Sequence, residues 1–112
     1  MNNHDPNVEV ERVPSSSQSD LNITSANSYF EGGSFYIVGE VLNNADGDKE
    51  FVKVTATLYG DENSVIGTDY TFTDPSTITS NEAAPFKLLI GTNDVGDLND
   101  IDSYKITASA NE

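Results

Sequence analysis

The sequence predicts an all-β protein: an immunoglobulin-like antiparallel β-sandwich of six to seven strands that follows a disordered N-terminal tether. Apolar and polar residues alternate over several short segments, and clusters of Gly, Asp, Asn and Pro separate these segments. No window has a capped helical period. Short strands without intervening helices are typical of sandwiches and barrels. The chain has no Cys and no Trp, which excludes the disulfide-centred antibody pattern.

Residues 1–20 are predicted to be a flexible leader or linker rich in Ser and Asn. The segment 13–20, Val-Pro-Ser-Ser-Ser-Gln-Ser-Asp, has almost nothing to bury and so cannot offset the entropy of ordering. The valines at positions 8, 10 and 13 leave open a short strand in this leader. Residues 21–112 are predicted to form a single domain, because 112 residues have room for one core.

The first half of the domain is expected to hold two strands. The first covers residues 21–25 and is followed by a turn over residues 27–34, which contains two adjacent glycines. The second covers residues 35–42, and a loop with Asp-Gly turn chemistry follows over residues 43–48. The residues of the second strand expected to face the core are Ile37, Gly39 and Val41.

The cleanest two-residue period lies in residues 51–59, and three further strands are expected over 65–72, 85–90 and 104–108. A break at Asp74-Pro75-Ser76 ends the first of these three. The residues expected to face inward are Val52, Val54, Ala56, Leu58, Ile66, Tyr70, Phe72, Phe86, Leu88, Ile90, Tyr104 and Ile106.

The chain is strongly acidic, with 19 Asp and Glu against 5 Lys and Arg, a net charge of −14 and a pI near 4.1. Such a chain repels nucleic acids and anionic membrane surfaces. Cation binding, adaptation to a salty medium and simple solubility remain as explanations of the charge. No apolar run has the length of a membrane span, so membrane insertion is not expected. We expect a signal or anchor region to precede this chain in its parent protein.

Several segments resemble the FxLYD domain family. The resemblance covers about residues 34–108, and its main parts are Val38-Gly39-Glu40-Val41-Leu42-Asn43-Asn44 and Phe51-Val52-Lys53-Val54-Thr55-Ala56-Thr57-Leu58-Tyr59. It continues through Val65-Ile66-Gly67-Thr68, Thr73-Asp74-Pro75 and Glu82-Ala83-Ala84-Pro85-Phe86-Lys87, and ends with Tyr104-Lys105-Ile106.

The chain departs from the motif that names the family, since Ala56 stands where Phe is usual and Gly60 where Asp is usual. The resemblance implies an immunoglobulin-like sandwich from secreted or lipid-anchored surface proteins of prokaryotes. It carries over no catalytic or binding residue, so Leu58 and Tyr59 are interpreted as packing positions.

One acidic loop, residues 92–102, is the candidate metal site. Closely spaced carboxylates could supply several of the six to eight oxygen ligands that calcium prefers. The spacing does not match an EF-hand, and Leu98 and Ile101 are expected to reach into the core. A solvated acidic loop is the alternative. The calcium candidates are Asp94, Asp97, Asp100 and Asp102, and no other cofactor is expected.

No catalytic residue is predicted, and the chain is not expected to be an enzyme. His4 is the only histidine and lies in the leader, so neither a zinc cluster nor a catalytic triad is indicated. The aromatics Tyr29, Phe30, Phe35, Tyr36 and Phe51 exceed what one core face holds. Phe51 also lies outside the inward register of its strand. Two explanations remain: the extra rings form an exposed patch for protein or glycan contact, or they cover a sheet edge.

The expected function is therefore a non-catalytic interaction or spacer module at the cell surface or outside the cell, monomeric, with a protein or glycan as partner. The alternative is an acidic, cation-responsive structural domain that binds calcium or is adapted to salt.

Overall fold

A computed structural model describes residues 11–12 and 20–111 of the chain. It has seven strands in two sheets, and four of them enclose most of the core. One sheet has the order β2-β3-β6 and the other the order β1-β7-β4-β5, with all pairs antiparallel except β1 with β7. The strands are β1 (Glu11–Arg12), β2 (Leu21–Glu31), β3 (Ser34–Asn43), β4 (Glu50–Tyr59), β5 (Val65–Phe72), β6 (Ala83–Ile90) and β7 (Ser103–Asn111).

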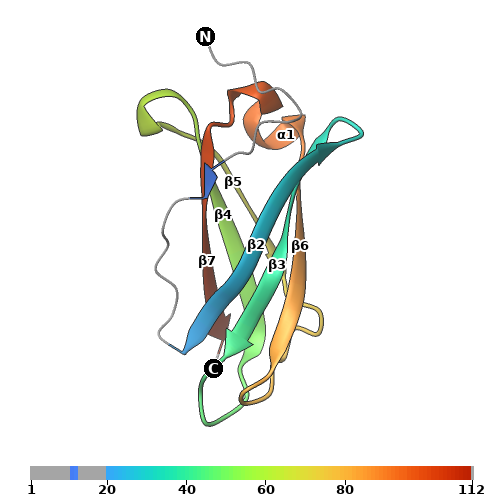
Figure 1. Cartoon of the computed structure of the whole chain (residues 1–112), viewed down its shortest axis with the longest axis vertical. Helices are drawn as coiled ribbons and strands as arrows, with labels where there is room; N and C mark the ends of the chain where they lie inside the picture. Colours follow the sequence, from blue (N-terminus) through green and yellow to red (C-terminus); the bar gives the residue numbers. More distant parts are fainter. Residues whose placement is uncertain (1–10, 13–19, 112) are drawn as a thin grey trace.

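The two sheets face each other as a sandwich, and from β2 onward the chain changes sheet after β3, after β5 and after β6 (Figure 1). Three short helical turns lie in the connections: η1 (Asp61–Asn63), α1 (Thr92–Val95) and η2 (Leu98–Asp100). The predicted immunoglobulin-like antiparallel sandwich of six to seven strands is confirmed. Among the described residues, no helix has the length and apolar character needed to cross a membrane.

The core follows the two-residue period of β3, β4, β6 and β7, because alternate side chains of a strand point to opposite faces. The predicted inward residues of these four strands are buried, apart from Gly39, which is half-buried. Ile101 is buried and Leu98 packs against the core, as expected. The buried hydrophobic residues are Leu21, Phe35, Ile37, Val41, Val52, Val54, Ala56, Leu58, Ile78, Ala84, Phe86, Leu88, Ile90, Ile101, Tyr104, Ile106 and Ala108.

The β2–β3 hairpin corrects the prediction of a turn over residues 27–34. Strand β2 continues to Glu31, which pairs with Ser34, so the loop consists of Gly32 and Gly33 alone. Both glycines have positive φ, +58° and +80°, as a two-residue primed turn requires. The polar residues of this segment suggested a loop, but they lie along an edge strand that is exposed to water.

In β5 the prediction that Tyr70 and Phe72 face inward is wrong. The register with β4 shifts between Leu58 and Tyr59, which pair with Gly67 and Val65, so that Ile66 forms a bulge. A bulge adds one residue to one strand and so reverses the facing of every residue beyond it. Ile66 packs against the core as predicted, whereas Tyr70 and Phe72 point to solvent.

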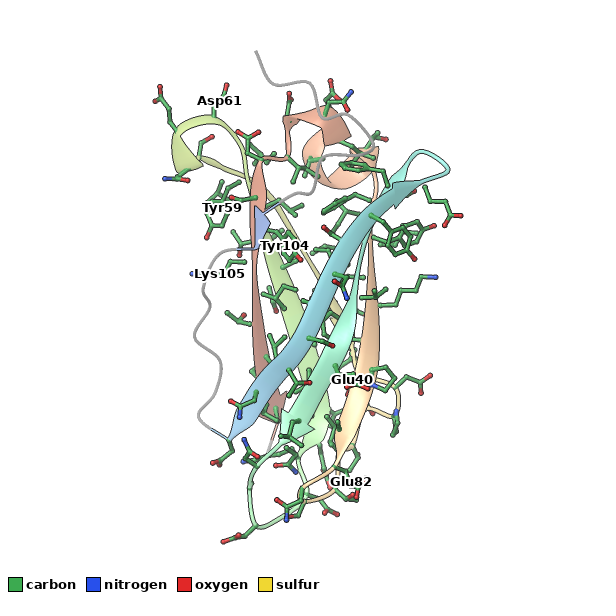
Figure 2. The ribbon with its side chains drawn as sticks, viewed as in Figure 1. Glu40, Tyr59, Asp61, Glu82, Tyr104 and Lys105 are labelled. Carbon is green, nitrogen blue, oxygen red and sulfur yellow. The ribbon has the colours of Figure 1, made fainter. Side chains whose placement is uncertain are left out.

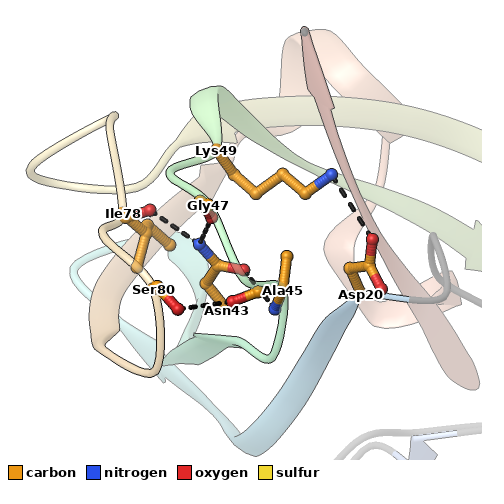
Figure 3. A network of polar contacts seen from close by, with 7 residues as sticks. All are labelled: Asp20, Asn43, Ala45, Gly47, Lys49, Ile78 and Ser80. Atoms are coloured by element: carbon orange, nitrogen blue, oxygen red, sulfur yellow. Dashed lines mark hydrogen bonds and ion pairs between the residues drawn. The ribbon is translucent and has the colours of Figure 1, made fainter.

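The end of the sandwich near residues 43–49 and 76–82 is held by a buried amide (Figure 3). Asn43 has no exposed surface, and its Nδ2 donates to the carbonyls of Gly47 (2.9 Å) and Ile78 (2.8 Å). Its Oδ1 accepts from the Ala45 amide at 2.8 Å. Because a buried polar group is costly when it is unpaired, this network fixes two loops to each other.

Part of the predicted leader contacts the domain. Strand β1 pairs Glu11 with Ser103 and Arg12 with Tyr104, and the Asp20 carboxylate lies 3.5 Å from the buried Lys49 ammonium (Figure 3). The three valines that left open a strand in the leader lie outside the described residues.

Candidate functional site

The outer surface of the β5-β4-β7 part of the second sheet, here called the β4 face, is the strongest candidate site. Its side chains alternate with the buried residues of the same strands, so they point away from the core. Strand β4 is in the middle and pairs with β5 on one side and β7 on the other. Three rows of side chains cross the face in the order β5, β4, β7: Phe72–Lys53–Ser109, Tyr70–Thr55–Thr107 and Thr68–Thr57–Lys105.

A groove of about 510 Å³ lies at the Phe72 end of this face. Phe51 and Phe72 line it and leave 56% and 44% of their surfaces exposed. The neighbouring Tyr70 is 55% exposed, and its ring meets that of Phe72 edge-on at 6.0 Å. The Lys53 ammonium lies 4.2 Å from the centre of the Tyr70 ring, a cation–π contact. The groove is lined by Phe51, Lys53, Phe72, Ser109 and Ala110.

Phe51 is held in the groove by a strained backbone. Its φ is +52°, a left-handed conformation that is unfavourable for a bulky residue. The β4–β7 register shifts between Glu50 and Lys53, so a bulge at this position turns the Phe51 ring to solvent. Such a conformation costs about 1–3 kcal/mol and is concentrated at functional sites. The ring recovers only part of this cost through burial, since more than half of it is exposed.

The charge of the β4 face differs from that of the chain as a whole. The three rows contain two lysines and no acid, although the chain has a net charge of −14. Asp69 is the only acid of β5, and it lies opposite the buried Ala56, on the inner side of the strand. Figure 2 shows Asp61 and Glu82 at opposite ends of the sandwich and Lys105 on the outer side of β7. The three rows are thus free of acids, and the exposed Glu50, which pairs with Asn111, lies one step beyond the Lys53–Ser109 row.

The opposite surface, the outer face of β2-β3-β6, has a second but less open aromatic group. Tyr29 and Tyr36 stack at 5.0 Å, and the Lys87 ammonium lies 5.0 Å from the Tyr36 ring. Tyr36 is half-buried, and Tyr29 is 38% exposed, less than any ring of the groove. Glu40 is exposed on the same face (Figure 2). These rings line neither the groove of the β4 face nor the smaller pocket near residues 75–84.

The calcium candidates lie in and around α1 and η2. The Asp97 carboxylate accepts from the Asn99 amide at 2.9 Å and caps η2, which also contains Asp100. The Asp102 amide donates to the Tyr59 carbonyl at 2.8 Å. The side chain of Asp94, in α1, lies outside the described residues. Within the described part of the chain no three acids, histidines or cysteines come together in a group able to hold a metal. The calcium hypothesis stays a prediction.

The five aromatics that exceeded one core face divide between the two alternatives. Phe35 is fully buried, Phe30 and Tyr36 are half-buried, Tyr29 is exposed on the other sheet, and Phe51 belongs to the exposed groove. Sequence reasoning missed Tyr70 and Phe72 as partners of Phe51, because the bulge at Ile66 was not recognised. The Ile66-Gly67 pair was the available signal, since a glycine within a strand often marks a bulge.

The fold and this surface define the class: an all-β sandwich domain with a solvent-facing aromatic groove on one sheet. No protein-family model matches the chain, and no curated protein matches it. Among solved structures it is similar to a DUF1425 family member from Shewanella sp. pv-4, with a TM-score of 0.52 and 8% identity over 82% of this chain and 79% of that chain. At this identity the similarity shows the fold alone. The FxLYD family is named by none of these comparisons, so that resemblance stays a hypothesis.

Proposed function

We propose that this chain is a non-catalytic interaction and spacer module of an extracellular protein, secreted or lipid-anchored, and that the β4 face is its contact surface. The observation that carries the proposal is the groove, where a strained backbone holds an exposed aromatic ring beside a second one. Exposed apolar surface with a polar rim is typical of interaction sites. The resemblance to the FxLYD family supports the extracellular setting.

A binding role is favoured over catalysis by the chemistry of the groove. Of the described residues that line it, Lys53 alone is ionisable. General acid–base or nucleophilic catalysis needs a second group within hydrogen-bond reach of the first. Aromatic rings with one cation and one hydroxyl suit recognition instead.

The path of the chain supports the spacer role. Strand β1 pairs with the first residues of β7, and β7 then runs the length of the sandwich to Asn111, which pairs with Glu50 at the other end. The molecule is elongated, with extents of 47 × 27 × 23 Å. Strand β1 and the last residues of β7 thus lie toward opposite ends of the sandwich, a geometry that suits a spacer.

The test uses cell envelopes of the organism that makes the protein. The full chain is immobilised on beads and incubated with washed envelope fragments, alongside Phe72→Ala and Tyr36→Ala variants. Phe72 belongs to the groove, and Tyr36 is its matched control on the other sheet. We expect retention of fragments by the wild type and by Tyr36→Ala, and its loss in Phe72→Ala. Equal retention by all three would overturn the assignment of the contact surface.

A further inference from the structure

We infer that the β4 face binds a neutral polysaccharide, with sugar rings placed on Phe51, Phe72 and Tyr70. This inference rests on the proposed function, since it assigns a ligand class to the same surface. Each pyranose ring has an apolar C–H face that gains by covering an aromatic ring, while its hydroxyl edge needs hydrogen-bond partners. The β4 face offers both kinds of group in adjacent rows.

The side chains of the three rows complement the chemical groups of a sugar chain. Phe72, Tyr70 and Phe51 supply rings at or beside the groove, and the same rows continue into hydroxyls and ammonium groups. A volume of about 510 Å³ is within the range of small-ligand sites, about 300–1,000 Å³. Because the rows extend beyond the groove along β4, a polymer can cover more of the face than one sugar unit. The hydroxyl and ammonium groups of the rows are Thr55, Thr57, Thr68, Thr107, Ser109, Lys53 and Lys105.

Charge favours a neutral polymer over an anionic or a cationic partner. The net charge of −14 repels a polyanion during its approach, whatever the two lysines of the face contribute locally. A basic protein would be attracted to the acids at the two ends of the sandwich, of which Asp61 and Glu82 are examples, and not to the three rows, whose charged residues are both lysines (Figure 2). A neutral sugar chain experiences neither effect.

Backbone pairing argues against an extended peptide as the ligand. A peptide that adds to a sheet needs a free edge, where its main chain finds unpaired amide and carbonyl groups. Strand β4, which carries Phe51 and Lys53, is paired on both sides along the face, and a peptide added to the edge strand β5 would lie beside the three rows and not over them. A ligand that covers the three rows must therefore bind through side chains, which is how rings and hydroxyls recognise sugars.

The direct test measures binding of the full chain to four purified neutral polymers: glucomannan, mixed-linkage β-glucan, mannan and dextran. Affinity gel electrophoresis and titration calorimetry give the affinities, and polygalacturonate is the anionic counterpart. We expect binding to at least one neutral polymer, with a loss of about tenfold or more in each of Phe51→Asn, Tyr70→Ala and Phe72→Ala, and little change in Tyr36→Ala. Calorimetric melting of every variant establishes that it is folded.

Two outcomes would overturn the inference: no binding to any neutral polymer, or equal losses in Tyr36→Ala and the groove variants. Preference for polygalacturonate would also overturn it, because it would make the lysines the main contacts. The envelope experiment separates this inference from the proposed function. Retention abolished by periodate oxidation of the envelope supports a glycan, whereas groove-dependent retention abolished only by protease overturns the glycan and leaves the interaction module standing.

Discussion

The two sheets of this sandwich use irregular strand pairing in opposite ways. In β2-β3-β6 the register shifts between Ile23 and Ser25, and the Ser25 carbonyl then lies over Gly39, which has no side chain to obstruct it. In the other sheet the shifts at Phe51 and Ile66 turn aromatic rings outward. Both sheets bury one face with the same two-residue period, so the period does not explain this difference.

The irregular pairings of the two sheets have different consequences for packing and for exposed surface. The β2 bulge and Gly39 bring strands and the Phe86 ring closer together, which stabilises the sandwich. The bulges of the β4 sheet have the opposite effect, because they expose apolar surface and hold Phe51 at positive φ. A cost of this kind suits a surface that binds a partner, which is the role proposed for the β4 face.

The largest expected effect on the free energy of unfolding comes from a comparison of one aromatic residue from each sheet. Phe35→Ala removes a fully buried ring of β3 and should lower the free energy of unfolding by about 4 kcal/mol. Phe51→Asn should leave stability unchanged within about 1 kcal/mol, because Asn tolerates positive φ and the lost ring is mostly exposed. Urea unfolding measures both. A loss above about 2 kcal/mol in Phe51→Asn would show that this ring is structural.

The next effect tests the close approach in the three-stranded sheet. A Cβ at Gly39 would lie 2.1 Å from the Ser25 carbonyl oxygen and 2.9 Å from the Phe86 ring. Gly39→Ala should therefore cost about 3 kcal/mol through displacement of β2. Gly47→Ala, where nothing lies within 4 Å, is the control and should change stability by less than about 0.5 kcal/mol. Equal melting of the two variants would contradict the packing role of the β2 bulge.

A smaller effect concerns the two lysines that lie over tyrosine rings. Lys53→Met removes the contact with Tyr70 at 4.2 Å, and Lys87→Met removes the one with Tyr36 at 5.0 Å. Each variant should lose about 0.5 kcal/mol, with the larger loss for Lys53→Met because its contact is shorter. Both variants change the net charge equally, so the comparison is matched. Chemical denaturation gives the values, and the reverse order would contradict the interpretation.

The smallest expected effect is a difference in melting temperature between two salts, and it tests the acidic connection that contains α1 and η2. Sodium chloride and calcium chloride at equal ionic strength should raise the melting temperature by the same amount, because screening relieves repulsion among the acids. Calorimetric scans measure the two shifts. A rise at low calcium that sodium does not reproduce, and that Asp97→Asn and Asp100→Asn remove, would establish the calcium site predicted from the sequence.

The sequence was sufficient to predict which residues of the regular strands face the core. Val52, Val54, Ala56 and Leu58 were predicted to face inward from alternation alone, and all four are buried. The prediction from alternation was wrong for the residues after Ile66. One extra residue in a strand turns every later side chain to the opposite face of the sheet, and it does so without changing the composition. The buried Asn43 was also missed, since its amide is satisfied by the carbonyl of Gly47 in its own loop together with that of Ile78 in a loop far along the chain.

By itself, the sequence determined an all-β sandwich with an acidic exterior, because period-two patterning and charge are local properties of the chain. Only the tertiary structure decided where the aromatic groove lies and which rows of side chains are free of acids. These depend on register between strands, which is set by pairing across the sheet. Phe51, Lys53 and Phe72 form one surface because β5 and β7 pair with β4 in one register, and no single segment of the sequence specifies that register.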